Sequence, residues 1–188
     1  MSRRRALLAA LSAPALCAPL VLAPPAEAKL IAREVIHEEF DEPVEDWCGQ
    51  EGLTVQVEGT YDAVFRLVSQ GREQLIHFRG RERIDETHTA NGVTTRVTVA
   101  NVFNDLKVTD NGDGTLTIII LATGNATLYG PDGEAIARNP GQVRFRLVVD
   151  HGGTPTDPSD DEEIDFEQIK GSTGRSDDFC EAELALFG

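Results

Sequence analysis

Residues 142–149, QVRFRLVV, alternate apolar and polar side chains along almost their whole length. Successive side chains of a β-strand point to opposite faces, so this stretch predicts a strand with one face toward a core and one toward water. Similar alternation recurs along the chain between turn residues placed roughly every 8–12 positions, which is typical of an all-β fold. The sequence therefore predicts an antiparallel sheet.

Turn residues divide the chain into about eight or nine predicted strands. The first covers residues 33–40 and a short last one covers 164–166. The runs 53–57 and 61–67, 115–121 and 125–129, and 134–138 and 142–149 are each predicted as two strands joined by a turn. Short consecutive turns predict a meander, and a meander of about eight strands with one apolar face closes most easily into a small up-and-down barrel. A two-sheet sandwich is the alternative.

A closed barrel would turn one apolar set of side chains toward its interior. An eight-stranded barrel is just wide enough to be filled by those side chains or to hold one small ligand. The inward set, which also supplies the candidate ligand-lining residues, is Val55, Val57, Phe65, Leu67, Ile76, Phe78, Val97, Val99, Ile118, Ile120, Phe145 and Leu147.

The first 28 residues have the features of a secretory signal peptide. Arg3-Arg4-Arg5 form a positively charged start, an apolar run follows, and Ala26-Glu27-Ala28 matches a small-x-small cleavage site. Prolines within the apolar run disfavour the alternative of an uncleaved spanning helix. We therefore expect residues 29–188 to form a single secreted domain with no membrane attachment after cleavage.

Two cysteines, Cys48 and Cys180, lie in the expected mature domain. An even cysteine count in an exported chain predicts one disulfide. This bond would join the beginning of the domain to its end, and would hold down a short helix predicted near residues 181–186.

The chain is strongly acidic, with 17 Lys and Arg against 32 Asp and Glu and a net charge of −15. Three basic residues and one acidic residue leave with the signal peptide, which takes the net charge to −17. This balance argues against nucleic acid or an anionic membrane as a partner, because both need a basic surface.

Arg79, Arg81 and Arg83 occupy alternate positions, so they share one face of one strand. They are candidates for an anion site at a barrel mouth, because guanidinium groups bind carboxylates and phosphates through paired hydrogen bonds. The structural alternative pairs them across the sheet with Glu58 or Asp62.

The remaining motifs give no catalytic residue, metal or cofactor. Residues 152–163 form an acidic, proline-containing loop, but its carboxylates lack the spacing of a calcium cage. The segment Asp110-Asn111-Gly112-Asp113-Gly114 fails the calcium-loop pattern and is a hairpin turn. The four histidines have no metal-ligand spacing, and nucleophile and phosphate-loop motifs are absent from the sequence.

Short motifs give the chain a resemblance to a group of proteins. They are Glu39-Phe40-Asp41, Cys48-Gly49, Asp113-Gly114-Thr115 and Asp178-Phe179-Cys180-Glu181-Ala182, behind a secretory signal. In these the chain resembles the small uncharacterised secreted β-rich proteins of high-GC Gram-positive bacteria. At the level of fold alone it is similar to lipocalin-like or allene-oxide-cyclase-like barrels. The resemblance implies no activity and no catalytic residue.

Three classes of function remain open from the sequence. The first is a binding protein that holds a small apolar molecule in the barrel. The second is a cell-surface structural or protein-interaction module, which the doubly apolar residues 118–121 favour, since that strand would need the terminal helix or a second subunit to cover it. The third is a cofactor-free isomerase or cyclase.

Overall fold

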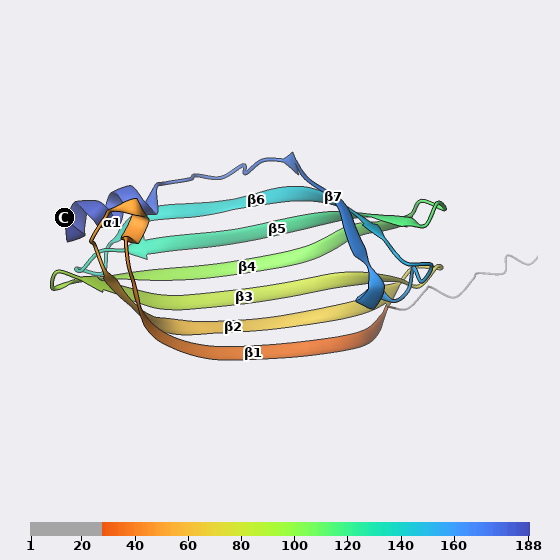
Figure 1. Ribbon diagram of the computed structural model, residues 1–188, viewed down its shortest axis with the longest axis horizontal. Coiled ribbons are helices and arrows are strands. Elements are labelled where there is room, and N and C mark those ends of the chain that lie inside the picture. The colour runs from red at the N-terminus through yellow and green to blue at the C-terminus, as the bar shows by residue number, and fades with distance from the viewer. Residues whose placement is uncertain (1–27) are drawn as a thin grey trace, which may run out of the picture.

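Seven antiparallel strands form one sheet in the computed structural model, which describes residues 28–188, and the strands follow one another in sequence order (Figure 1). They are β1 (Lys29–Val44), β2 (Val55–Gln70), β3 (Leu75–Ala90), β4 (Val93–Asp110), β5 (Thr115–Tyr129), β6 (Ala135–Asp150) and β7 (Glu162–Lys170). The predicted all-β meander is confirmed. The signal peptide prediction falls on residues 1–27, which lie outside the described residues, and its last residue, Ala28, is the first residue that the structure describes.

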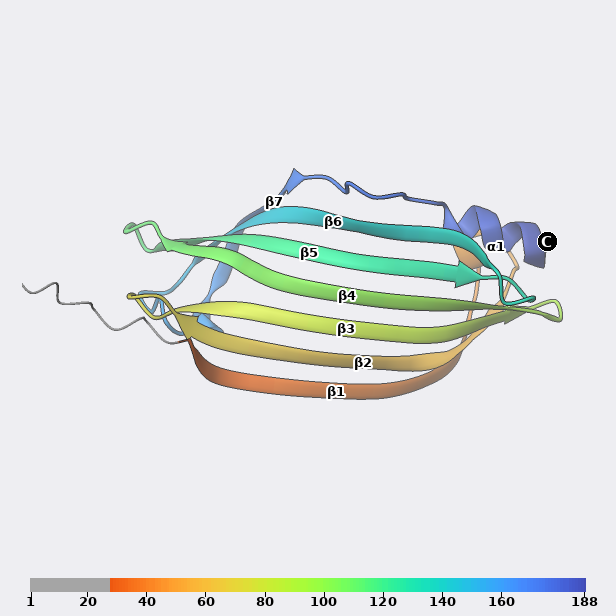
Figure 2. The same ribbon diagram turned by 180° about the vertical axis from the view of Figure 1, so that it is seen from behind.

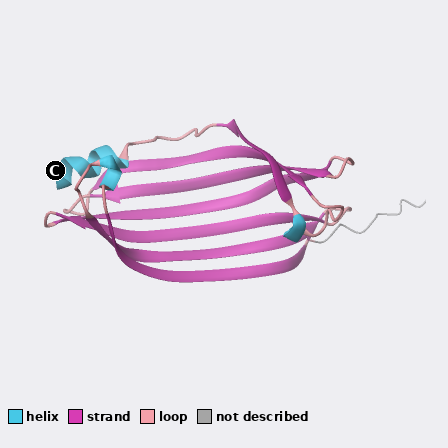
Figure 3. Ribbon diagram, viewed as in Figure 1, coloured by secondary structure: helices cyan, strands magenta, loops and turns pink. Residues whose placement is uncertain are grey.

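Two short 3-10 turns and one helix complete the fold, as Figure 3 shows by colour. They are η1 (Trp47–Gly49), η2 (Pro158–Asp160) and α1 (Phe179–Phe187). The Asp178 side chain accepts a hydrogen bond from the backbone N–H of Glu181 and so caps the start of α1. In the described part of the chain, no helix is long and apolar enough to cross a membrane.

Three of the predicted turns lie inside long strands. The runs predicted as separate strands at 53–57 and 61–67, 115–121 and 125–129, and 134–138 and 142–149 merge into β2, β5 and β6. A Cβ on Gly59 would lie 2.6 Å from the carbonyl oxygen of Asp85, and one on Gly124 or Gly141 would collide with the side chain of Asn101 or Ser172. These glycines permit a neighbouring segment of the same chain to approach closely, and they do not reverse the direction of the backbone.

Pro140 lies within β6, where a central strand would lose a ladder hydrogen bond. The partner of β6 on its outer side is β7, which pairs only with residues 144–150. At Pro140, β6 is therefore an edge strand, and the missing N–H leaves no unpaired partner.

The sheet is open. Hydrogen-bonded pairing runs from β1 to β7 and stops there, so the predicted closed barrel is not formed within residues 28–188. The merging of predicted strands leaves seven where eight or nine were expected, and β7 has only nine residues against sixteen in β1. No hydrogen-bonded pairing joins β7 to β1.

One face of the sheet carries the C-terminal structure, and we call it the inner face. Figures 1 and 2 show α1 over one end of this face and β7 crossing the other end on the same side. Phe187 of α1 packs with Val55 and Val57, and Phe179 packs near Val97 and Leu128. The predicted alternation is thus confirmed, with the apolar set of these strands facing α1.

The disulfide between Cys48 and Cys180 is formed, as predicted, and it links η1 to α1 across a sequence separation of 132 residues. It holds the C-terminal helix at the end of the sheet where β1 ends and β2 begins. The helix itself is longer than residues 181–186, since it starts at Phe179.

Candidate functional site

An apolar cavity of about 410 Å³ lies on the inner face, at the end of the sheet away from α1. Its floor is formed by side chains from five neighbouring strands, β2 to β6, and its roof by the loop that follows β6. Phe78, Phe103 and Ile118 are central members of the floor, and Pro155 and Pro158 belong to the roof. This volume falls in the range of small-molecule sites, about 300–1,000 Å³.

The roof is the acidic loop of the sequence analysis, and it is folded over the cavity. The Asp157 carboxylate accepts the backbone N–H of Ser159 at 3.1 Å and so caps η2. The Thr154 hydroxyl lies 2.8 Å from both oxygens of Asp160. Thr154, Asp157, Ser159 and Asp160 are thus bonded within the loop, and Pro155 and Pro158 supply its apolar contacts to the cavity.

Asp105 brings a carboxyl group to the wall of this apolar cavity. The β4–β5 pairing shifts register between Asp105 and Lys107, and β3–β4 pairing ends at Arg79. Where the ladder ends, Asp105 Oδ2 accepts the backbone N–H of Phe78 at 2.7 Å. Burial raises the pKa of Asp105, against the opposing effects of this hydrogen bond and of His77.

Asp161 is the second carboxyl group at the cavity, contributed by the roof. Its Oδ1 atom is buried and has no hydrogen-bond partner in residues 28–188. Burial and the neighbouring Asp160 raise the pKa of Asp161, while His151 opposes them. The cavity therefore combines an apolar floor with an unsatisfied acceptor, and a hydrogen-bond donor on a bound molecule would satisfy it.

Half of the predicted lining residues reach this cavity: Leu67, Ile76, Phe78, Ile118, Ile120 and Leu147. Val99 and Phe145 line an adjoining hollow of about 470 Å³, which shares Phe103 with the cavity. Phe65 packs against Phe78, with ring centroids 5.5 Å apart. Val55, Val57 and Val97 belong to the packed clusters beneath α1, so they are core residues and do not line the cavity.

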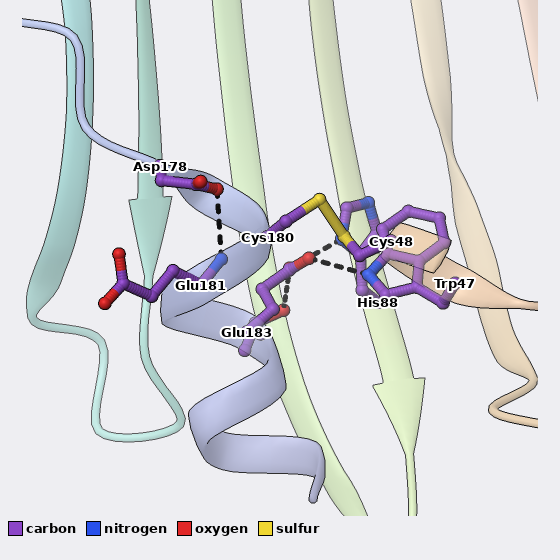
Figure 4. Close-up of a disulfide and its surroundings, with 8 residues drawn as sticks. Trp47, Cys48, His88, Asp178, Cys180, Glu181 and Glu183 are labelled. Atoms are coloured by element: carbon purple, nitrogen blue, oxygen red, sulfur yellow. Dashed lines mark hydrogen bonds and ion pairs between the residues drawn. A yellow bond between two sulfur atoms is a disulfide. The ribbon is translucent and has the colours of Figure 1, made fainter. Parts of the chain in front are cut away.

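A buried polar network joins α1 to the sheet at the opposite end (Figure 4). Glu183 is only 2% exposed, and its Oε1 accepts hydrogen bonds from His88 Nδ1 at 2.7 Å and Thr95 Oγ1 at 2.8 Å. Its Oε2 accepts the indole N–H of Trp47 at 3.0 Å. His88 Nε2 lies 3.2 Å from Glu86 Oε1. We call Glu86, His88, Thr95, Trp47 and Glu183 the helix clamp.

The helix clamp is arranged for stability and not for catalysis. Both imidazole nitrogens of His88 face carboxylates, and the residue is 4% exposed, so neither nitrogen is free to reach a substrate. Burial lowers the pKa of His88, but the Glu183 and Glu86 carboxylates outweigh burial and raise it to about 9. Burial raises the pKa of Glu183, but the hydrogen bond and charge of His88 outweigh burial and lower it.

The stability of the folded chain should consequently fall as the pH rises into the alkaline range. The pKa of His88 rises from 6.5 to about 9 on folding, so its contribution is fully present below pH 6.5 and disappears as the pH rises through about 9. We expect the melting temperature of the wild-type chain to decline between about pH 7 and 9, and His88→Gln to flatten that decline. Thermal denaturation at a series of pH values measures this decline.

His37→Gln is the control, because His37 is an exposed histidine paired with Asp62. This variant should keep the wild-type decline in melting temperature. A His88→Gln profile parallel to that of wild type would contradict the assignment of the decline to His88.

Arg79, Arg81 and Arg83 lie in the middle of β3 on the face opposite α1, which we call the outer face, and not at a barrel mouth. Arg83 stands opposite Asp62 in the register, as the cross-strand alternative predicts, but Asp62 is hydrogen-bonded to His37 at 2.7 Å. Glu58 stands opposite Thr87 and so is not their partner. Among the ion pairs of residues 28–188, none includes these three arginines.

The doubly apolar residues 118–121 are divided between the two faces. Ile118 and Ile120 line the cavity, whereas Ile119 and Leu121 lie on the outer face and are half-buried. In the register Ile119 stands between Lys107 and Arg146, whose alkyl stems can cover it. Neither α1 nor the roof loop lies on this face, so a subunit contact through the strand stays a prediction.

Sequence reasoning missed Asp105 and the whole helix clamp, and it treated Asp161 only as one carboxylate of the acidic loop. Within residues 28–188, no group of three or more His, Cys, Asp or Glu is placed to hold a metal ion. Comparison with known proteins adds no candidate residue. The chain matches no family model, no curated protein and no solved structure.

Proposed function

We propose that the chain is a binding protein for a small apolar molecule, held on the inner face of the open sheet under the loop that follows β6. The observation that carries the proposal is the cavity of about 410 Å³, floored by apolar side chains of five strands and roofed by Pro155 and Pro158. Concave, largely apolar sites with a few polar groups are the usual form of small-molecule sites. The ligand would lie in a half-wrapped sheet and not in the lumen of a closed barrel.

The two carboxyl groups narrow the class of molecule. A carboxylate or phosphate head group beside Asp105 and Asp161 would meet like charge in an apolar setting, where repulsion is strong. An alcohol or amine could donate a hydrogen bond to the unsatisfied Asp161 Oδ1. We therefore propose a neutral or cationic molecule with an apolar body, and not a fatty acid.

The proposal includes export of the chain. The formed disulfide supports it, because such bonds persist in oxidising compartments and are rare in the cytosol. Binding of an apolar molecule outside the cell would suit a chain with this cavity and a strongly acidic composition.

The test fills the cavity from its floor. Ile118→Trp places a large ring in the cavity, so we expect the affinity for the neutral dye N-phenyl-1-naphthylamine to fall at least about tenfold, since the dye and the indole compete for one volume. Fluorescence titration of the folded, disulfide-bonded chain measures it.

Ile119→Trp is the matched control, because it adds the same ring to the outer face of the same strand. Its affinity should stay within about twofold of wild type, and thermal denaturation of both variants verifies folding. Equal dye affinity in Ile118→Trp and wild type, or no dye binding to wild type, would overturn the proposal.

A further inference from the structure

A row of seven residues, five of them basic, crosses the outer face of the sheet. Arg33 of β1 stands directly opposite Arg66 of β2, and Arg66 stands directly opposite Arg79 of β3. Residues paired in this way project from the same face. The register continues the row to β7, so that its members are Arg33, Arg66, Arg79, Asn104, Leu121, Arg144 and Lys170. We call these seven residues the basic row.

Within residues 28–188, the three arginines of β1 to β3 form no ion pair with a carboxylate, although the chain has 32 acidic residues. All three are exposed. Arg79 donates only to the Gln70 amide oxygen, at 3.1 Å. Like charges placed directly opposite one another destabilise a sheet. Repulsion between these arginines therefore destabilises the sheet, and an external anion bound between them would relieve it.

The rows on either side contain no carboxylate across β1 to β3. One flanking row consists of Val35, Val64 and Arg81, and the other of Leu30, Val68 and His77. Asp62, opposite Arg83, is a further row away and is bonded to His37. Charges in water are screened within about 8–10 Å, so an anion on the basic row would experience the arginines more strongly than the net charge of the chain.

We propose that the basic row binds a linear phosphate-bearing polyanion that lies across the strands. Adjacent strands are about 4.8 Å apart, so the row extends about 29 Å from Arg33 to Lys170, with a basic residue at five of its seven positions. This length suits an extended polymer and exceeds a single small anion. Guanidinium forks match phosphate oxygens in pairs. Phe, Tyr and Trp are missing from the row and from its flanking rows on β1 to β3, and the flanking His77 is buried, so bases of a nucleic acid would find no aromatic side chain to stack on.

The test uses long-chain inorganic polyphosphate and the disulfide-bonded chain. At about 50 mM salt we expect the triple variant Arg33→Gln, Arg66→Gln and Arg79→Gln to bind at least about tenfold more weakly than wild type, and the affinity of wild type to fall as salt is added. The control triple variant Arg96→Gln, Arg146→Gln and Arg175→Gln removes the same charge from arginines already paired with carboxylates. Its affinity should stay within about twofold of wild type.

The variants also separate this site from a general loss of charge. Removal of the opposed arginines should leave the melting temperature equal to wild type or higher, so weaker binding would not reflect unfolding. An equal loss of affinity in the two triple variants would overturn the proposal. So would tighter row-dependent binding of anionic lipid vesicles or single-stranded DNA than of polyphosphate, or failure of wild type to bind polyphosphate.

Discussion

Loss of the Cys48–Cys180 disulfide is expected to lower the free energy of unfolding by about 4–5 kcal/mol, because the bond closes a loop of 132 residues in the unfolded chain. For a domain of this size that corresponds to a fall of about 10–20 °C in melting temperature. The nine-residue α1 depends on this bond, since an isolated helix of that length is marginal in water. Thermal denaturation of the double variant Cys48→Ala, Cys180→Ala measures the loss.

Trp47 gives the same experiment a local readout, since it is the single tryptophan of the chain and lies beside the bond. Release of α1 would expose its indole, which now donates to Glu183, and would shift its emission to the red. Reductant should reproduce the effect in wild type and have no effect on the double variant. A change in unfolding free energy below about 1 kcal/mol would show that the disulfide does not hold the helix.

Glu183→Ala is the second substitution for which we expect a large effect, a loss of about 3–5 kcal/mol in the free energy of unfolding. The carboxylate accepts three hydrogen bonds, from His88, Thr95 and Trp47, all at the contact between α1 and the sheet. Its removal leaves a charged imidazole and an indole N–H buried without their partner. Denaturant unfolding monitored by circular dichroism measures the loss.

Glu181→Ala is the matched control, because this glutamate is exposed on the same helix two residues earlier. We expect it to change the free energy of unfolding by less than about 1 kcal/mol. Glu183→Gln should fall between wild type and Glu183→Ala, since the amide oxygen still accepts a hydrogen bond but has no charge for His88. Equal stability of Glu183→Ala and Glu181→Ala would contradict the claim that the helix clamp stabilises the fold.

The sequence predicted the features that depend on local pattern. Alternation at residues 142–149 predicted a strand, and it predicted correctly which side chains of β6 face the core. The even number of cysteines in the expected mature domain predicted the disulfide. The breaks expected between the predicted strands fall at Gly59, Gly124 and Gly141, and glycine is common both in turns and at close contacts within sheets. The sequence alone does not distinguish a glycine in a turn from a glycine at a close contact, because the difference lies in the position of the neighbouring segment.

The chemistry of the molecule depends on contacts between distant residues. Glu183 and His88 are 95 residues apart, and Asp105 and Phe78 are 27 apart, so no local spacing marks either pair. The basic row likewise arises from the register of β1, β2 and β3. Its arginines stand far apart in sequence, and only Arg79 belonged to the pattern that alternation made visible.

The most direct test of the central claim is a crystal structure of the disulfide-bonded chain with N-phenyl-1-naphthylamine. We expect electron density for one dye molecule between Phe78, Ile118 and Pro155, on the inner face and beneath the roof loop. The same crystals of Ile118→Trp should show the indole in that volume and no dye. Dye bound elsewhere on the chain, with the cavity filled by its own side chains, would contradict the account.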